Sequence, residues 1–352
     1  MTETTRTTPE QAAAAFRRIA ETARSEHAPL YEHVAAGVAA DPDLLELSTH
    51  ARPGQSLVYL LFDAVQYLLL GGARHELARY YPSITETPLD AADVFPVFRA
   101  FCLENAETIK TLVANHNNQT NEVGRLAALL PALSEAARRG GGKPLGIVEV
   151  GPAAGLNLCF DRYYFDYGRV QWGDDASPVR IVCQLEAAAT PPLSPGLPAV
   201  AYRVGLDVEP IDLSDDDAAR WMLSSTWPDH RDLQLMQRRA IELLRRDPPR
   251  LVLGDALAVG PLLDAVPADL TLCVYQSFMI SHLSEAEREQ FLAILAAESR
   301  RRPVYFVSMT GAGIGGGSRR GRVDLLSWVE GRHESVQLVE GHSHGRSLRW
   351  LG

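Results

Sequence analysis

The sharpest change in the hydrophobic pattern lies at residues 144–157. An apolar run there follows the breakers Gly140, Gly141, Gly142 and Pro144, which is typical of a buried parallel strand. Two glycines, Gly151 and Gly155, then bend the chain. After them apolar residues recur at helical spacing, at Leu156, Phe160, Tyr163 and Tyr164. The stretch predicts a strand, a glycine turn and a helix, as at the opening of a nucleotide-binding domain.

Upstream of this stretch, from Thr8 to about Arg139, the pattern predicts one helix after another and shows no alternation with a period of two. The most apolar part, 55–70, is interrupted by Asp63 and Gln66 and is short for a membrane span, so we expect a buried helix and no membrane association. Glycines 140–142 mark the expected boundary. We therefore expect a helical cap or substrate domain at 1–140 and a second domain at 141–352.

Downstream, strand-like runs alternate with helical stretches, which indicates an α/β domain with a parallel sheet. The expected strands after the first one lie at 179–184, 202–207, 250–256, 270–275 and 304–309, followed by a pair at 324–329 and 334–339 joined by a turn at Gly331. A further edge segment is expected at 348–351. The long proline-rich connection at 190–198 suggests an insertion between strands.

Composition narrows the class of protein. The chain has 352 residues, 46% hydrophobic and 22% charged, as expected for a globular protein large enough for two domains. Its 44 acidic and 34 basic side chains give a formal charge of −10, which argues against a nucleic-acid partner. Four widely spaced cysteines, Cys102, Cys159, Cys183 and Cys273, predict neither a zinc knuckle nor a redox motif and fit a reducing cytoplasm. The oligomeric state stays open.

An acid follows each of three expected strands: Glu149, Asp207 and Asp255. In an open parallel sheet, ligands lie beyond the carboxyl ends of the strands. There, glycines allow close approach of the backbone, and carboxylates accept from ribose hydroxyls or from the amino group of a base. Three acids at regular intervals therefore favour a nucleoside-containing cofactor over the alternative that they only form turns and helix caps. Asp174 or Glu186 could take the place of Asp207 as the ribose acid.

The segment from Glu149 to Gly155 resembles the first motif of the class I S-adenosylmethionine-dependent methyltransferases, with Ala153 where a glycine usually stands. The resemblance implies a Rossmann-like sheet, mostly parallel with an antiparallel last strand, behind the all-helical N-terminal domain. It implies S-adenosylmethionine as cofactor. The cofactor-binding residues that it implies are Glu149, Gly151, Ala153, Gly155, Asn157, Asp207, Asp255, Ala256, Tyr275 and Gln276.

The chain more closely resembles a bacterial family known as domain of unknown function 2332, through Gly155-Leu156-Asn157-Leu158, Trp221 with Trp227-Pro228, and residues 119–125. Two features depart from the methyltransferase pattern: Ala153 itself, and the roughly fifty residues between the first motif and Asp207, where about twenty are usual. The Asn/Asp-Pro-Pro-aromatic motif of nucleic-acid methyltransferases is absent, because Tyr275-Gln276-Ser277-Phe278 stands in that place. The expected acceptor is therefore a small molecule or a peptide.

Methyl transfer is an in-line displacement that needs positioning and often a base that deprotonates the acceptor. His282, just after the fourth strand, is the first candidate base, although it could equally bond at the entry of the next helix. His116 and Glu122 are the second candidates. They are the ionisable groups of an amide-rich segment, Asn115 to Glu122, which is either a pocket wall or a capping turn.

Two other motifs are weaker indications of a functional site. His342 and His344 are too few ligands for zinc, so a polar turn is expected and no metal site. The glycine-rich loop 311–321 lacks the ending of a P-loop and is expected to be a connection or a lid. Two alternatives to a methyltransferase remain: a non-catalytic sensor or interaction protein that binds the cofactor, and a nicotinamide-dependent oxidoreductase. Ala153 and Leu156 disfavour the oxidoreductase, since glycines are needed there.

Overall fold

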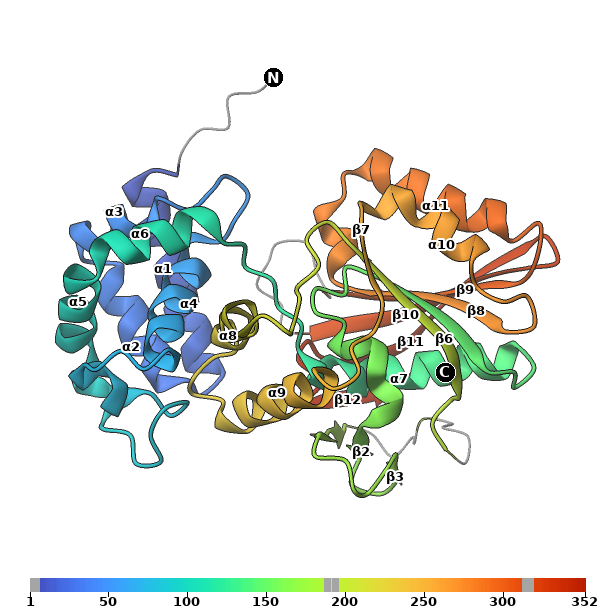
Figure 1. Cartoon of the computed structure of the whole chain (residues 1–352), viewed down its shortest axis with the longest axis horizontal. Helices are drawn as coiled ribbons and strands as arrows, with labels where there is room; N and C mark the ends of the chain where they lie inside the picture. The colour runs from blue at the N-terminus through green and yellow to red at the C-terminus, as the bar shows by residue number, and fades with distance from the viewer. Residues whose placement is uncertain (1–6, 187–190, 192–195, 312–319) are drawn as a thin grey trace. The chain divides into compact units, whose positions relative to one another are not determined.

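The computed structural model describes residues 7–186, 191, 196–311 and 320–352. The chain divides into two compact units (Figure 1). Unit 1 consists of residues up to 120 together with 215–238, and unit 2 of 121–214 together with 239–352. This division differs from a boundary at residue 140, because α7 (Leu126–Arg139) packs on the sheet of unit 2. The proline-rich connection and the glycine-rich loop fall largely outside the described residues.

Unit 1 is helical, as the pattern predicts. Its helices are α1 (Pro9–Ser25), α2 (Pro29–Val38), α3 (Pro42–Ser48), α4 (Leu57–Leu70), α5 (Val94–Glu104), α6 (Ala106–Asn115), α8 (Asp216–Ser224) and the first half of α9 (Arg231–Leu244), with the 3₁₀ helices η1 (Glu76–Tyr80) and η2 (Ala91–Asp93). The buried rings of Phe16, Tyr31, Phe62 and Phe98 form the aromatic centre of its core. Thr8 begins α1 with a capping box that it forms with Gln11.

The polar interruptions of α4 are buried and hydrogen-bonded rather than exposed. Asp63 accepts from Asn118 at 2.8 Å and from Ser225 at 3.0 Å, both through Oδ2. The Gln66 amide donates to the carbonyls of Ser224 and Thr226, each at 2.7 Å. These bonds explain why 215–238 belongs to the helical unit: the end of α8 supplies partners that α4 requires.

The apolar stretch 95–113 forms two helices. The first, α5, ends and α6 begins at Asn105, whose backbone leaves the helical region at φ −110° and ψ 19°. The Asn105 amide donates to the carbonyl of Phe101 at 2.9 Å. This local bond competes with the helical ladder and accounts for the break.

Unit 2 is built on a nine-stranded sheet with the order β5-β12-β11-β10-β9-β8-β1-β6-β7. The strands are β1 (Leu145–Val150), β5 (Gln184–Leu185), β6 (Val200–Asp207), β7 (Leu251–Leu253), β8 (Thr271–Ser277), β9 (Val304–Gly311), β10 (Arg320–Val329), β11 (Arg332–His342) and β12 (Ser347–Trp350). The half from β7 to β9 is parallel, and β10 is antiparallel to both neighbours. The sheet is therefore mostly parallel, but β10, β11 and β12 all alternate in direction, and β5 pairs in parallel beyond them.

The segment after the glycine turn is not the expected α-helix. It is the 3₁₀ helix η4 (Leu156–Arg162), kinked at Cys159, where φ is −109° and ψ is 28°. The next residues enter a small sheet of β2 (Tyr164–Asp166), β3 (Gln171–Trp172) and β4 (Arg180–Val182). Consecutive aromatic residues at 163–165 have a high strand propensity, which explains why helical spacing was misleading here.

Helices cover the large sheet on both sides (Figure 1). The helix α7 packs against β8 to β11 on one side. On the other side α10 (Gly260–Asp264) and α11 (Glu285–Glu298) bury Leu262, Phe291 and Leu295 against alternate residues of β1, β6, β8 and β9. Apolar residues on both faces of these strands explain their continuous hydrophobic runs.

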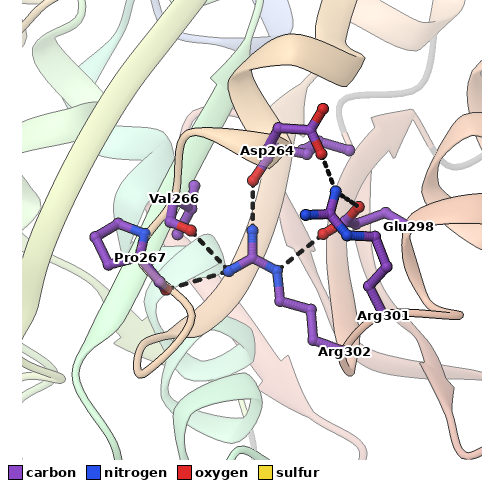
Figure 2. A network of polar contacts seen from close by, with 7 residues as sticks. Asp264, Val266, Pro267, Glu298, Arg301 and Arg302 are labelled. Carbon is purple, nitrogen blue, oxygen red and sulfur yellow. Dashed lines mark hydrogen bonds and ion pairs between the residues drawn. The ribbon is translucent and has the colours of Figure 1, made fainter.

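Two arginines tie α11 to α10 (Figure 2). Arg302 donates to Glu298 at 3.0 Å, to the carbonyls of Val266 and Pro267 at 2.9 and 3.1 Å, and to that of Leu263. Arg301 bonds Asp264 and, at 3.2 Å, Glu298. The two arginines that follow α11 thus bond groups at and just after the end of α10.

Candidate functional site

Three residues of the glycine turn after β1 have a left-handed backbone conformation with positive φ. Gly151, Ala153 and Gly155 have φ values of +79°, +50° and +76°. Alanine is strained in this left-handed region, where glycine is not. Ala153 is held there because its N–H donates to Asp207 Oδ2 at 2.8 Å, while Asp207 Oδ1 accepts from the N–H of Glu209 at 2.9 Å.

Other residues of the protein lie close to this turn. A Cβ added to Gly151 would lie 2.7 Å from Cβ of Met279, and one added to Gly155 would lie 2.7 Å from Cγ of Pro249. The first N–H of η4, on Leu156, donates to Asn121 Oδ1 at 2.9 Å. The turn is therefore held from three sides by the protein itself.

Glu149 lies at the end of β1 and is completely buried. Its Oε2 accepts from the Tyr275 hydroxyl at 2.9 Å, while Glu149 Oε1 and Asn157 Oδ1 are buried without a hydrogen-bond partner among the described residues. Burial raises the pKa of Glu149 to about 8, assisted by nearby Asp207 and opposed by the Tyr275 bond and by Arg125. The carboxyl group is therefore largely protonated at neutral pH.

The other expected cofactor residues differ in accessibility. Gln276 is buried and donates to Ser308 Oγ at 2.8 Å and to the carbonyl of Met309 at 3.0 Å. Asp255 is exposed and caps the 3₁₀ helix η5 (Ala256–Val259), accepting from the N–H of Leu257 at 2.8 Å. Ala256 follows it and is buried.

The competing ribose acids lie elsewhere in the topology. Asp207 ends β6, which is next to β1, whereas Glu186 follows β5 at the opposite edge of the sheet and pairs with Arg320 at 3.0 Å. Asp174 lies in the loop between β3 and β4 and accepts from the N–H of Ala176 at 2.9 Å. Among the three acids, only Asp207 stands at the end of the strand beside β1.

An ionisable cluster lies beside the carboxyl end of β8. We call it the strand-end cluster and define it as Glu122, Arg125, Glu149, Ser277 and His344. The Glu122 carboxylate contacts His344 Nδ1 and lies 3.9 Å from Arg125 Nε. Arg125 Nη1 donates to Ser277 Oγ at 3.2 Å. The cluster thus joins a histidine and a carboxylate to the guanidinium of Arg125, a residue that is only 8% exposed.

Burial lowers the pKa of Arg125, although Glu122 and Glu149 act in the opposite direction. Its guanidinium carbon lies 4.9 Å from the centre of the Phe278 ring, which supports a cation–π contact. Phe278 has φ +66° directly after β8. Strain of this kind is often found at functional positions.

The C-terminal turn is fitted tightly to this cluster. Gly345 has φ +75°, and a Cβ added to it would lie 1.8 Å from the carbonyl oxygen of Gly124. Only glycine allows this approach of two backbones. It places His344 beside Glu122, although 222 residues separate them.

The three candidate bases do not gather in one place. Glu122 belongs to unit 2 and His116 to unit 1, where its ring centre lies 4.0 Å from that of Trp221 and its Nδ1 lies 3.1 Å from the Leu112 carbonyl. His282 is exposed at the end of the 3₁₀ helix η6 (Met279–His282). Within the amide segment, Asn117 Oδ1 accepts from Arg52 at 2.6 Å and Asn118 donates to Asp63, so these two amides bond side chains of unit 1.

Sequence reasoning did not select Arg125, Ser277 or His344. A signal for Arg125 was present, since it is the one basic residue in the otherwise apolar stretch 123–133. The signal for His344 was weaker: a histidine pair followed by Gly345, which was interpreted as a polar turn. Among the described residues, no group of three or more His, Cys, Asp or Glu side chains could hold a metal ion.

The fold defines a mixed α/β protein with a helical N-terminal region and a large, mostly parallel sheet. The chain belongs to the family described as uncharacterized protein conserved in bacteria, domain of unknown function 2332, whose model matches residues 13–350. This match confirms the family expected from the sequence. No curated protein and no solved structure matches the chain. In the described part of the chain, none of the helices has the length and apolar character for crossing a membrane.

Proposed function

We propose that the chain is an S-adenosylmethionine-dependent methyltransferase that acts on a small-molecule or peptide acceptor. The observation that carries the proposal lies at the ends of β6 and β7. Val208, which follows Asp207, is 68% exposed, and Leu253, the register partner of Asp207, is 73% exposed. An exposed apolar pair at the strand ends that also carry Asp207 and Asp255 suits the flat base and the ribose hydroxyls of a nucleoside.

These residues fit the nucleoside part of the cofactor. Asp207 is 6% exposed and uses its oxygens for two backbone N–H groups, but each carboxylate oxygen can accept a second hydrogen bond. Val208 and Leu253 would cover the base, and Asp255 would accept from its amino group. The bound cofactor would supply a methyl group on a positively charged sulfur.

The strand-end cluster would serve the acceptor. A carboxylate beside His344 Nδ1 orients the imidazole so that its Nε2 can take a proton from an acceptor hydroxyl or amine. For a hydroxyl acceptor, the Arg125 guanidinium favours the negative charge that develops on the deprotonated oxygen. This assignment places the base at His344 with Glu122, in preference to His282 and His116, because the cluster joins a histidine, a carboxylate and a cation.

Isothermal titration calorimetry with S-adenosylmethionine tests the proposal. We expect saturable heat in the wild type, at least tenfold weaker binding in Asp255→Ala, and unchanged binding in the control Asp269→Ala, which removes an exposed aspartate before β8. His344→Ala is expected to bind the cofactor normally and to form less methylated product in an acceptor screen. No heat at millimolar cofactor would exclude the proposal.

A second candidate function is a cofactor-binding sensor or interaction protein without transfer. One observation favours it: the N–H groups of the turn already donate to protein acceptors. These donors are Gly151 to the Leu206 carbonyl, Ala153 to Asp207, Gly155 to the Pro152 carbonyl and Leu156 to Asn121. The sensor predicts calorimetric binding with no methylated product from any acceptor, and detection of such a product would eliminate it.

A further inference from the structure

The amino end of β1, opposite the end with Glu149, adjoins a cavity of about 280 Å³. Its walls are the last turns of α7, the turn at Gly142 and Lys143, and the segment 196–199 that leads into β6. Lys143 and Gly151 are eight residues apart along an extended strand, which corresponds to roughly 25 Å. The cavity is therefore separate from the proposed cofactor site.

Ser134 gives the cavity an unsatisfied polar group. This residue lines the cavity from α7 and is 6% exposed, and its Oγ is buried without a hydrogen-bond partner among the described residues. A buried hydroxyl without a partner costs about 1–3 kcal/mol, so such groups are normally satisfied by a ligand or water. A hydroxyl can donate to an anion.

Two cations line the same cavity. Lys143 is exposed and makes no ion pair within the described residues. Arg138 lies one helical turn after Ser134, on the same face of α7. Its Nε and Nη2 donate to Glu135 at 2.7 and 2.6 Å, and the guanidinium has further N–H groups beyond these two donors.

Lysine is rare in this chain. Of 34 basic residues only two are lysine, Lys110 and Lys143. Lys110, in unit 1, pairs with Glu107 at 2.8 Å. The protein has a net charge of −10, and nearly all of its basic residues are arginine. The compact ammonium group of Lys143 therefore provides a local positive charge that attracts an anion.

We propose that this cavity binds a small dianion, a phosphate or a dicarboxylate, held by the Lys143 ammonium, the Ser134 hydroxyl and the Arg138 guanidinium. The three groups supply the charge and the directed donors that such anions need. The site is independent of the proposed methyl transfer.

Amine acylation followed by mass spectrometry tests the proposal on the full-length wild type. The acylation rates of Lys143 and of Lys110 are measured separately in the same sample, so that Lys110 serves as an internal control. We expect 10 mM inorganic phosphate or 10 mM succinate, at constant ionic strength, to slow acylation of Lys143 at least fivefold and to leave Lys110 unchanged. If only phosphate or only succinate slows the acylation of Lys143, that result identifies the class of anion that the cavity binds. Equal rates at Lys143 with and without both anions, or equal protection of both lysines, would overturn the proposal.

Variants extend the test. We expect Ser134→Ala to lower the protection of Lys143 at least threefold, and phosphate or succinate to raise the Tm of wild type and Lys110→Ala more than that of Lys143→Ala. Both lysine variants change an exposed side chain or a surface pair and are expected to fold. Identical Tm shifts in the two lysine variants contradict the site.

Discussion

The backbone N–H of Ala153 donates to Asp207 Oδ2 at 2.8 Å, so that a strained turn residue is fixed by the acid at the end of the neighbouring strand. Replacing Asp207 with alanine leaves two N–H groups, those of Ala153 and Glu209, without acceptors. Each loss costs about 1–3 kcal/mol. We expect Asp207→Ala to lower the free energy of unfolding by roughly 2–4 kcal/mol in urea denaturation. Asp255→Ala, which removes an exposed helix cap, is expected to lower the free energy of unfolding by only about 1 kcal/mol. Equal losses of stability in the two variants would show that the Asp207 bonds do not hold the turn.

The conformation of Ala153 predicts how the turn tolerates substitution. Glycine removes the left-handed strain of about 1 kcal/mol, which offsets its greater loss of backbone entropy. We therefore expect Ala153→Gly to be within about 0.5 kcal/mol of wild type, whereas Ala153→Val loses more than about 2 kcal/mol because a branched side chain is disfavoured at φ +50°. Urea titrations of both variants measure this difference. A valine variant as stable as the glycine variant contradicts the strain.

Glu149 predicts a loss of stability at alkaline pH. Burial raises its pKa in the folded protein to about 8 from an ordinary value of 4.5, so the folded state binds more protons between these values. The free energy of unfolding then falls as pH rises, by up to about 1.4 kcal/mol per pH unit. In urea titrations from pH 5 to 9, we expect Glu149→Gln to reduce this slope. An unchanged slope in the variant would show that Glu149 is ionised in the folded protein.

Asp63 makes the same prediction in unit 1. Burial raises the pKa of its carboxyl to about 8, against the effect of the bonds from Asn118 and Ser225. Both bonds reach one oxygen, so Asp63→Asn can keep both with its carbonyl oxygen. We expect the stability of the variant relative to wild type to be greater at pH 8.5 than near pH 5, because over most of this interval the wild-type carboxyl is ionised in the unfolded state but protonated in the folded state. Tm measured at the two pH values gives the comparison, and an equal difference between variant and wild type at both would contradict it.

Gly345 predicts the effect of disturbing the strand-end cluster. The Cβ of an alanine there would lie 1.8 Å from the carbonyl oxygen of Gly124, so the turn that carries His344 must move away from Glu122. We expect Gly345→Ala to destabilise the protein by more than about 2 kcal/mol and to reduce any methylated product more than cofactor binding. Gly331→Ala is a matched control, since that glycine also has a positive φ, +77°, but nothing lies within 4 Å of its added Cβ. Equal effects of the two substitutions would contradict the role of this approach.

Local sequence patterns predicted single strands and hairpins better than contacts between residues that are far apart in the sequence. The apolar run of β1 and the hairpin at Gly331 were both visible, because each depends on residues close in sequence. The helix after Gly155 was wrong, since helical spacing of aromatic residues also occurs where the chain turns into strands. The contact of Glu122 with His344 was beyond local reasoning, because no periodicity joins residues 222 positions apart.

The division of unit 1 into two stretches, up to 120 and 215–238, has a consequence for synthesis. As the chain leaves the ribosome, α4 emerges long before the carbonyls of Ser224 and Thr226 that Gln66 requires. By then the first strand of unit 2 has also emerged, so the nascent protein holds two unfinished cores at once. Binding of a folding helper to buried surface of α4 is therefore expected to persist until residue 238 has been made.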